Sequence, residues 1–129
     1  MRRWQLLASC LCLALTGCVS GYGGCLFVSP VKHTLSGSVH FKTYPGRDSV
    51  DNVPVLELDK MAYIYSPAQS FSCIATDEMQ LEGISEFPEN VVEGSHVSVN
   101  GEVSAAISNS QHTRFVLNVI TLLPASKAP

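Results

Sequence analysis

The alternation of apolar and polar residues along the chain predicts an all-β domain. Between Thr34 and Tyr44 one face is apolar and the other polar, as in a half-buried strand, and Gly37 in its middle predicts a bend or a bulge. The clearest hairpin pairs Val97–Ala105 with Phe115–Leu122 around a polar turn. Further short strands are predicted at 53–58, 61–65, 71–75 and 79–84, the second either separate or continuing the first after a bulge, and with a turn at Asp77-Glu78 between the last two.

One short helix is predicted over Ser85–Gly94. Ser85 suits its N-cap, Pro88 its first turn and Gly94 its C-terminal stop. A bent first strand, several short strands and a short helix before the last hairpin predict a small five- to six-stranded Greek-key barrel of the OB type. A flatter β-sandwich is the alternative.

The N-terminus predicts export and lipid attachment. Met1-Arg2-Arg3 is cationic, and Trp4–Leu15 is almost entirely apolar but too short for a permanent membrane span. The next residues, Leu15-Thr16-Gly17-Cys18, resemble the lipobox of bacterial lipoproteins. The resemblance implies cleavage before Cys18, diacylglycerol on its sulfur and a further acyl chain, commonly palmitate, on its new amino group. An ordinary secretory signal with an incidental cysteine is the alternative.

These signals divide the chain into a signal peptide (1–17), the lipidated Cys18 with a Gly-rich tether (18–24), a β-domain (25–123) and a disordered tail (124–129). Two or three acyl chains give stable membrane attachment. Val19 stands where an aspartate would signal retention in the inner membrane. We therefore expect an outer-membrane lipoprotein that faces the periplasm.

Charge and cysteine content narrow the class further. Loss of residues 1–17 reduces the basic residues from 8 to 6 against 11 acidic ones, a net charge of −5, which argues against nucleic-acid binding. Cys10 and Cys12 leave with the signal, so Cys25 and Cys73 remain to pair in an oxidising compartment. The alternative for these two is a pair of buried free thiols.

No catalytic or metal-binding motif is found in the sequence. The four histidines lack metal-ligand spacing, the serines lack a nucleophile elbow, and Glu82, Glu86, Glu89 and Glu93 are typical of a solvated acidic face. We therefore expect no enzyme activity, no metal and no cofactor apart from the lipid. His40, Tyr44 and His112 are the candidates for a binding face.

Two groups of strand motifs resemble a family of small bacterial envelope proteins catalogued only as a domain of unknown function. The first group is Leu35-x-Gly37-x-Val39, Tyr44-Pro45-Gly46 and Val55-Leu56-Glu57-Leu58-Asp59. The second is Val97-x-Val99-x-Gly101 and His112-Thr113-x-Phe115-x-Leu117-x-Val119. The resemblance covers residues 25–123 and implies an OB-like barrel, with no activity attached to it.

Three functions are compatible with these observations. The first is a non-catalytic protein-binding or scaffold lipoprotein with a protein partner in the periplasm. The second is an immunity or inhibitor lipoprotein that neutralises a periplasm-acting toxin or hydrolase, since an acidic face steers toward basic partners. The third is a metal- or small-ligand-binding barrel that uses His40 and His112.

Overall fold

The computed structural model describes residues 21–22, 24–46, 50–65 and 73–124, which form an all-β fold. The predicted signal peptide, the predicted lipidation site Cys18 and residues 125–129 of the predicted tail lie outside the described residues. The strands are β1 (Gly21–Tyr22), β2 (Cys25–Phe27), β3 (Lys32–Pro45), β4 (Val50–Tyr65), β5 (Cys73–Glu82), β6 (His96–Ala105) and β7 (Phe115–Pro124).

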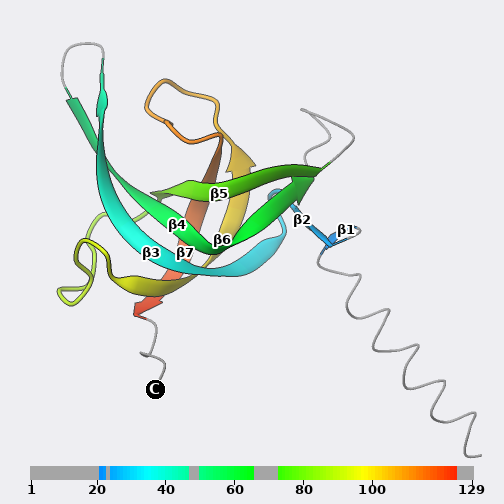
Figure 1. The fold of residues 1–129 in the computed structure, drawn as a ribbon, viewed down its shortest axis with the longest axis horizontal. Coiled ribbons are helices and arrows are strands. Elements are labelled where there is room, and N and C mark those ends of the chain that lie inside the picture. The colour runs from blue at the N-terminus through cyan, green and yellow to red at the C-terminus, as the bar shows by residue number, and fades with distance from the viewer. Residues whose placement is uncertain (1–20, 23, 47–49, 66–72, 125–129) are drawn as a thin grey trace, which may run out of the picture.

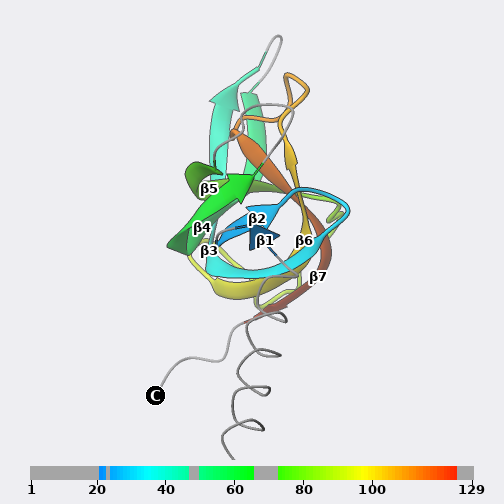
Figure 2. The ribbon, with the colours of Figure 1, turned by 90° about the vertical axis from the view of Figure 1, so that its right-hand side faces the viewer.

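Five of these strands close a ring of hydrogen-bonded pairs. The sheet has the order β1-β2-β4-β3-β6-β7-β5, and β5 also pairs with β4 (Figures 1 and 2). Strands β3, β4 and β5 follow one another as antiparallel neighbours, and β6 returns to lie beside β3, which is the Greek-key order. The pairing of β5 with β7 is parallel. The predicted all-β, OB-like Greek-key class is confirmed, and β1 and β2 extend the sheet beyond the ring.

Strand β3 exchanges one neighbour for another along its length, and Gly37 lies at the exchange. Residues 32–36 pair with β6, residues 39–45 pair with β4, and Gly37 and Ser38 pair with both. A Cβ atom at Gly37 would overlap the carbonyl oxygen of Glu57 on β4. The bend predicted at Gly37 therefore reflects a close approach of two backbones that only glycine permits.

Strand β4 is continuous through a bulge, which is the second of the two alternatives for residues 61–65. Its register against β5 shifts between Glu57 and Ala62, so that the extra residues of β4 lie opposite Asp77. The turn predicted at Asp77-Glu78 is wrong, because both residues lie within β5 and Glu78 pairs with Glu57. The irregularity in the chain lies in the bulge of β4 and not at Asp77-Glu78.

The helix predicted over Ser85–Gly94 is wrong, and the segment is an irregular loop. Its backbone groups bond to other partners: the amide of Gly94 donates to the Val39 carbonyl at 2.7 Å, and the amide of Val92 donates to the Ser95 hydroxyl at 2.8 Å. Val91 is buried in the core, and Phe87 packs edge to face on Phe41 at 5.4 Å. Packing of this loop against the ring outweighs the local helix signals.

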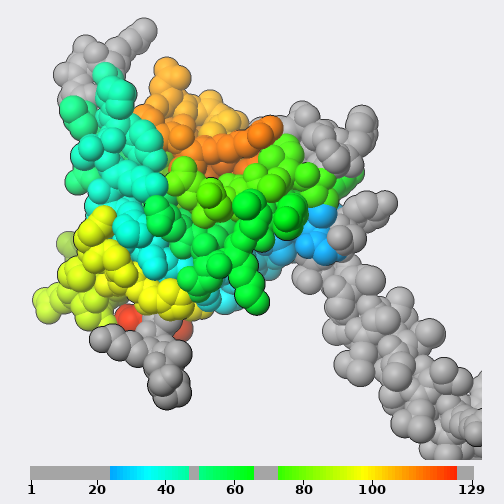
Figure 3. All heavy atoms as spheres, viewed as in Figure 1, coloured from blue at the N-terminus to red at the C-terminus, as the bar shows by residue number. Residues whose placement is uncertain are grey.

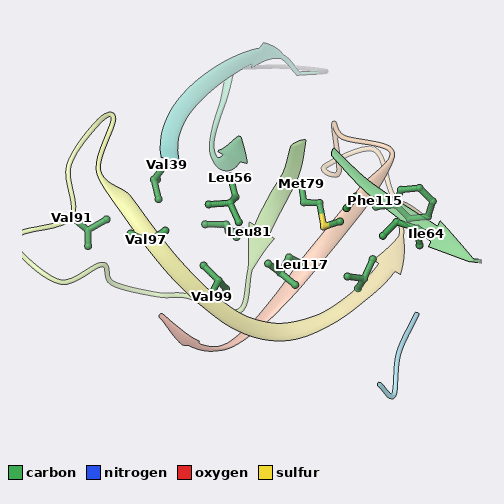
Figure 4. Packing of buried hydrophobic residues seen from close by; sticks show 12 residues of the cluster. Val39, Leu56, Ile64, Met79, Leu81, Val91, Val97, Val99, Phe115 and Leu117 are labelled. Carbon is green, nitrogen blue, oxygen red and sulfur yellow. The ribbon is translucent and has the colours of Figure 1, made fainter. Parts of the chain in front are cut away.

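The core lies inside the ring and receives side chains from all five of its strands (Figure 4). Its largest fully buried members are Phe115, Leu56, Ile64, Met79 and Leu117. Strands β4, β5 and β7 each bury adjacent residues, such as Val55 and Leu56. Since adjacent residues of a strand face opposite sides, part of the outer surface of the ring is also covered.

The two N-terminal strands are fastened to the ring by pairing and by a disulfide. Gly21 and Tyr22, placed in the tether by the sequence, pair with Leu26 and Cys25, and β2 pairs with the end of β4. The predicted disulfide between Cys25 and Cys73 is present, with its Cα atoms 6.2 Å apart. Within the described ranges, no helix combines the length and apolar character needed to cross a bilayer.

Candidate functional site

The outer surface of β3, β4 and β5 carries a connected set of polar side chains, which we call the polar face. Along β3, residues two apart point the same way, so His40, Lys42 and Tyr44 share this surface. Side chains from the neighbouring strands and from two loops join them. The polar face consists of His40, Lys42, Tyr44, Asp51, Glu57, Glu78, Gln80, Glu82, Glu93, Gln111 and His112.

His40 lies between two carboxylates from different parts of the chain. Its Nε2 is 3.2 Å from Glu57 Oε2, and its Nδ1 is 3.3 Å from Glu93 Oε1. The second carboxylate oxygen of Glu93 accepts the backbone amide of Phe41 at 3.1 Å. Glu93 therefore fixes both the imidazole and the strand beside it, and both ring nitrogens of His40 are engaged.

Lys42 joins the two acidic residues at the junction of β4 and β5. Its Nζ lies 2.8 Å from Glu78 and 3.2 Å from Glu57. The hydrogen bond to Glu78 raises the pKa of the Lys42 ammonium above its ordinary value; partial burial opposes this, and Glu57 adds to it. Lys42 is therefore a permanent cation, and no proton transfer near neutral pH is available to it.

His112 and Tyr44 form a parallel stack where the β6–β7 loop meets the β3–β4 hairpin. The ring centroids are 4.4 Å apart and the planes differ by 1°. His112 Nε2 lies 2.9 Å from Oδ2 of Asp51, the residue that pairs with Tyr44 across the hairpin. The stack and the contact between His112 and Asp51 thus hold the loop against the hairpin.

The rest of the β6–β7 loop is tied to β5. The backbone amide of His112 donates to Gln80 Oε1 at 2.9 Å, and Gln80 Nε2 donates to the Ser110 carbonyl at 3.0 Å. Gln111 donates to both carboxylate oxygens of Glu82 at 3.0 Å. These bonds explain why Gln80 is buried on the outer side of the ring: the loop covers it.

The structure places the three candidate residues on one surface, but they do not contact one another as a single group. His112 stacks on Tyr44, whereas His40 has other partners, Glu57 and Glu93. In the part of the chain that the structure describes, no three histidine, cysteine or carboxylate side chains are grouped as a metal site would need.

The remaining histidines have structural contacts. His33 is buried, and its Nε2 lies 2.8 Å from the Phe27 carbonyl oxygen. His96 lies 2.5 Å from Asp59. Asp51, Glu57 and Glu93 were missed as site residues, because their partners are 61, 17 and 53 residues away in sequence and no local pattern announces such pairs.

Two hollows in the surface lie away from the candidate residues. One, of about 400 Å³, is lined by Thr34, Leu35, Ser36, Leu58, Asp59 and Lys60, where β4 departs from β3. The other, of about 300 Å³, lies between the loop after β5 and the end of β7. Neither is lined by His40, Tyr44 or His112.

Comparisons with known proteins leave the site to be interpreted from its geometry. No protein-family model and no curated protein matches the chain.

Proposed function

We propose that the chain is a bacterial envelope lipoprotein whose ring of strands is a non-catalytic protein-binding domain facing the periplasm. The observation that carries this proposal is the composition of the polar face. Five carboxylates from β4, β5 and the loop between β5 and β6 converge on it, against one lysine and two histidines. They are five of the eleven acidic residues of the chain.

The physical properties of the polar face favour protein recognition over chemistry. Its side chains are partly exposed: Glu57 and Glu93 are 48% and 59% exposed. Surface carboxylates of this kind raise the encounter rate with a basic partner and fix its orientation. A base or nucleophile would need a free group in a hollow, whereas these side chains bond to one another and neither hollow described above is lined by His40, Tyr44 or His112.

The attachment to the membrane is proposed from the N-terminal sequence, with the lipid on Cys18. Val19 after the lipidated residue favours the outer membrane. The lipid is the only non-protein group in this proposal.

Substitution of Cys18 by alanine is expected to abolish lipid attachment, because the sulfur is the acyl acceptor. Incorporation of labelled palmitate and sedimentation of the protein with membranes measure this. Cys10→Ala is the matched control, since Cys10 lies inside the apolar signal and its loss is expected to leave the label unchanged. Equal labelling of the Cys18 variant and the wild type would contradict the anchor.

A second candidate, favoured by the same acidic surface, is an immunity or inhibitor lipoprotein. A toxin or hydrolase that binds an anionic substrate has a basic groove, and an acidic face on a rigid ring of strands is complementary to it. The third function considered includes metal binding, and no group of three ligating side chains within the described ranges supports a metal site.

Reversal of one charge on the polar face is expected to weaken partner binding roughly tenfold, mainly through a slower association rate. The variant is Glu57→Lys in the full-length lipoprotein, used as bait in detergent-solubilised envelopes. Glu86→Lys makes the same change in charge on an exposed loop residue outside the polar face. The partner is a protein retained by the wild type and by Glu86→Lys and depleted with Glu57→Lys, as quantified by mass spectrometry.

The same experiment distinguishes binding at the polar face from binding at another surface of the domain. A stoichiometric partner that Glu57→Lys retains would place binding elsewhere on the domain. The protein-binding proposal would be contradicted if the full-length lipoprotein enriched no protein relative to a control bait that consists of the lipid-anchored N-terminal segment alone.

A further inference from the structure

The end of the molecule that carries β1 and β2 lies next to the proposed lipid. Three Cα–Cα steps separate Cys18 from Gly21, the first residue of β1, so the two lie within about 11 Å of each other. β1 pairs with β2, and β2 pairs with Ile64 and Tyr65 of β4. Since paired strands are about 4.8 Å apart, the end of β4 lies within roughly 20 Å of Cys18.

This reach is short compared with the domain. A chain of about 100 residues has a radius of gyration of about 13 Å, so its opposite ends are farther apart than the tether can span. Figure 2 views the molecule from the end at which β1 and β2 lie, and Figure 1 shows the β3–β4 hairpin at the opposite side. The tether therefore keeps the β1–β2 end toward the bilayer and the hairpin away from it.

Two exposed apolar side chains occur on β4 at the membrane-proximal end. Met61 is 53% exposed and Tyr63 is 51% exposed, while Ala62 and Ile64 between and beyond them are buried. The two therefore share the outer face of the strand. Tyr63 pairs with the exposed Ala75 of β5, and in Figure 3 the green atoms of β4 lie beside the blue atoms of β2.

We propose that this outer face of β4, with Met61 and Tyr63 at its centre, rests in the headgroup region of the lipid bilayer. A tyrosine ring is amphipathic and prefers the membrane–water interface, and methionine adapts to an irregular apolar surface. The exposed Lys60 precedes Met61, and its long side chain can extend an ammonium to lipid phosphates. This inference rests on the lipid anchor of the proposed function.

The charges nearby favour zwitterionic lipid over anionic lipid as the occupant. Asp77 is exposed on β5 next to this face, and the mature chain has a net charge of −5. A surface of this charge is not drawn to an anionic leaflet. Two side chains also make a patch far smaller than a stable protein interface requires. The contact is weak by itself and is sustained by the high local concentration that the anchor imposes.

The orientation has a consequence for the polar face. Tyr44, Asp51 and His112 lie at the hairpin end, so this contact directs that end of the polar face away from the membrane and toward the periplasm. A partner can then reach it without approaching the lipid.

A single tryptophan reports on this contact. Trp4 is the only tryptophan of the chain and precedes the proposed cleavage site, so the mature lipoprotein has none. Tyr63→Trp places one in the proposed contact. Val50→Trp is the matched control, because Val50 is an exposed apolar residue (66%) at the other end of the same strand. Both lipidated variants are reconstituted into phosphatidylcholine vesicles, with and without bromine on the acyl chains near the headgroup.

We expect the tryptophan at position 63 to emit at shorter wavelength and to lose most of its emission in brominated vesicles, and the tryptophan at position 50 to emit as in water and to be unaffected. Equal behaviour of the two variants in vesicles that carry the protein would overturn the inference and leave the anchor intact. A shift at position 63 that requires native membranes and is absent in pure lipid would assign the face to a protein, which also overturns it. Failure of both variants to float with the vesicles would instead contradict the lipid anchor.

Discussion

Replacement of Gly37 by alanine is expected to reduce the free energy of unfolding by at least about 3 kcal/mol, or to prevent folding altogether. The added methyl group would overlap the carbonyl oxygen of Glu57, which belongs to the backbone of β4 and cannot rotate away. To accept it, β3 and β4 must separate at the point where β3 is bonded to β4 and β6 simultaneously. Urea denaturation of the wild type and the variant measures the effect.

A second glycine supplies the control. Gly94 has a φ of +83°, and a Cβ there meets no atom within 4 Å, so Gly94→Ala tests backbone strain without overlap. Its expected cost is about 1–2 kcal/mol. A smaller loss for Gly37→Ala than for Gly94→Ala would show that β3 and β4 are farther apart than the structure places them.

Loss of the disulfide is expected to reduce the free energy of unfolding by about 4 kcal/mol, because the bridge closes a loop between residues 48 apart in sequence. This is a large share of the 5–15 kcal/mol typical of a small domain. The paired substitution Cys25→Ser with Cys73→Ser removes the bridge and leaves no reactive thiol. The shift of the denaturation midpoint measures the effect.

The reduced wild type separates the bridge from the packing of its cysteines. Cys25 is buried, so its substitution also changes local packing. Wild-type protein in dithiothreitol keeps both side chains and is expected to lose nearly as much stability as the double variant. An unchanged midpoint under reduction would mean that the bridge contributes nothing to stability.

The strand pattern was predictable wherever a strand has one face in the core and the other in solvent. The alternation in Thr34–Tyr44 and in Val97–Ala105 corresponds to β3 and β6. Val55 and Leu56 are both fully buried. Leu56 points into the core of the ring, whereas Val55 points to the outer side, where polar side chains and a loop cover it. Strands that bury adjacent residues do not show the alternation of apolar and polar positions. The sequence therefore predicted the ends of these strands less well.

The errors arose where tertiary contacts overrode local signals. Ser85, Pro88 and Gly94 have the order of a helix start and stop, but Val91 fills the end of the ring and the backbone bonds to β3. The sequence indicated His40, Tyr44 and His112 as candidates for one binding face. His40 and Tyr44 belong to one predicted strand, and His112 belongs to a predicted turn. It did not predict that Asp51 and Glu93 complete the surface, because the fold alone brings these residues together.

The bridge between Cys25 and Cys73 also determines how mechanical load would enter the domain. With lipid on Cys18, a pull on the molecule from the periplasm is resisted at the membrane and reaches the fold through β1 and β2, whose few pairs would open first. The covalent bond passes that tension from Cys25 directly into β5, bypassing the terminal strands. Once β1 has opened, such a force would reach the ring of strands through the Cys25–Cys73 bridge and a segment of seven residues, 18–24.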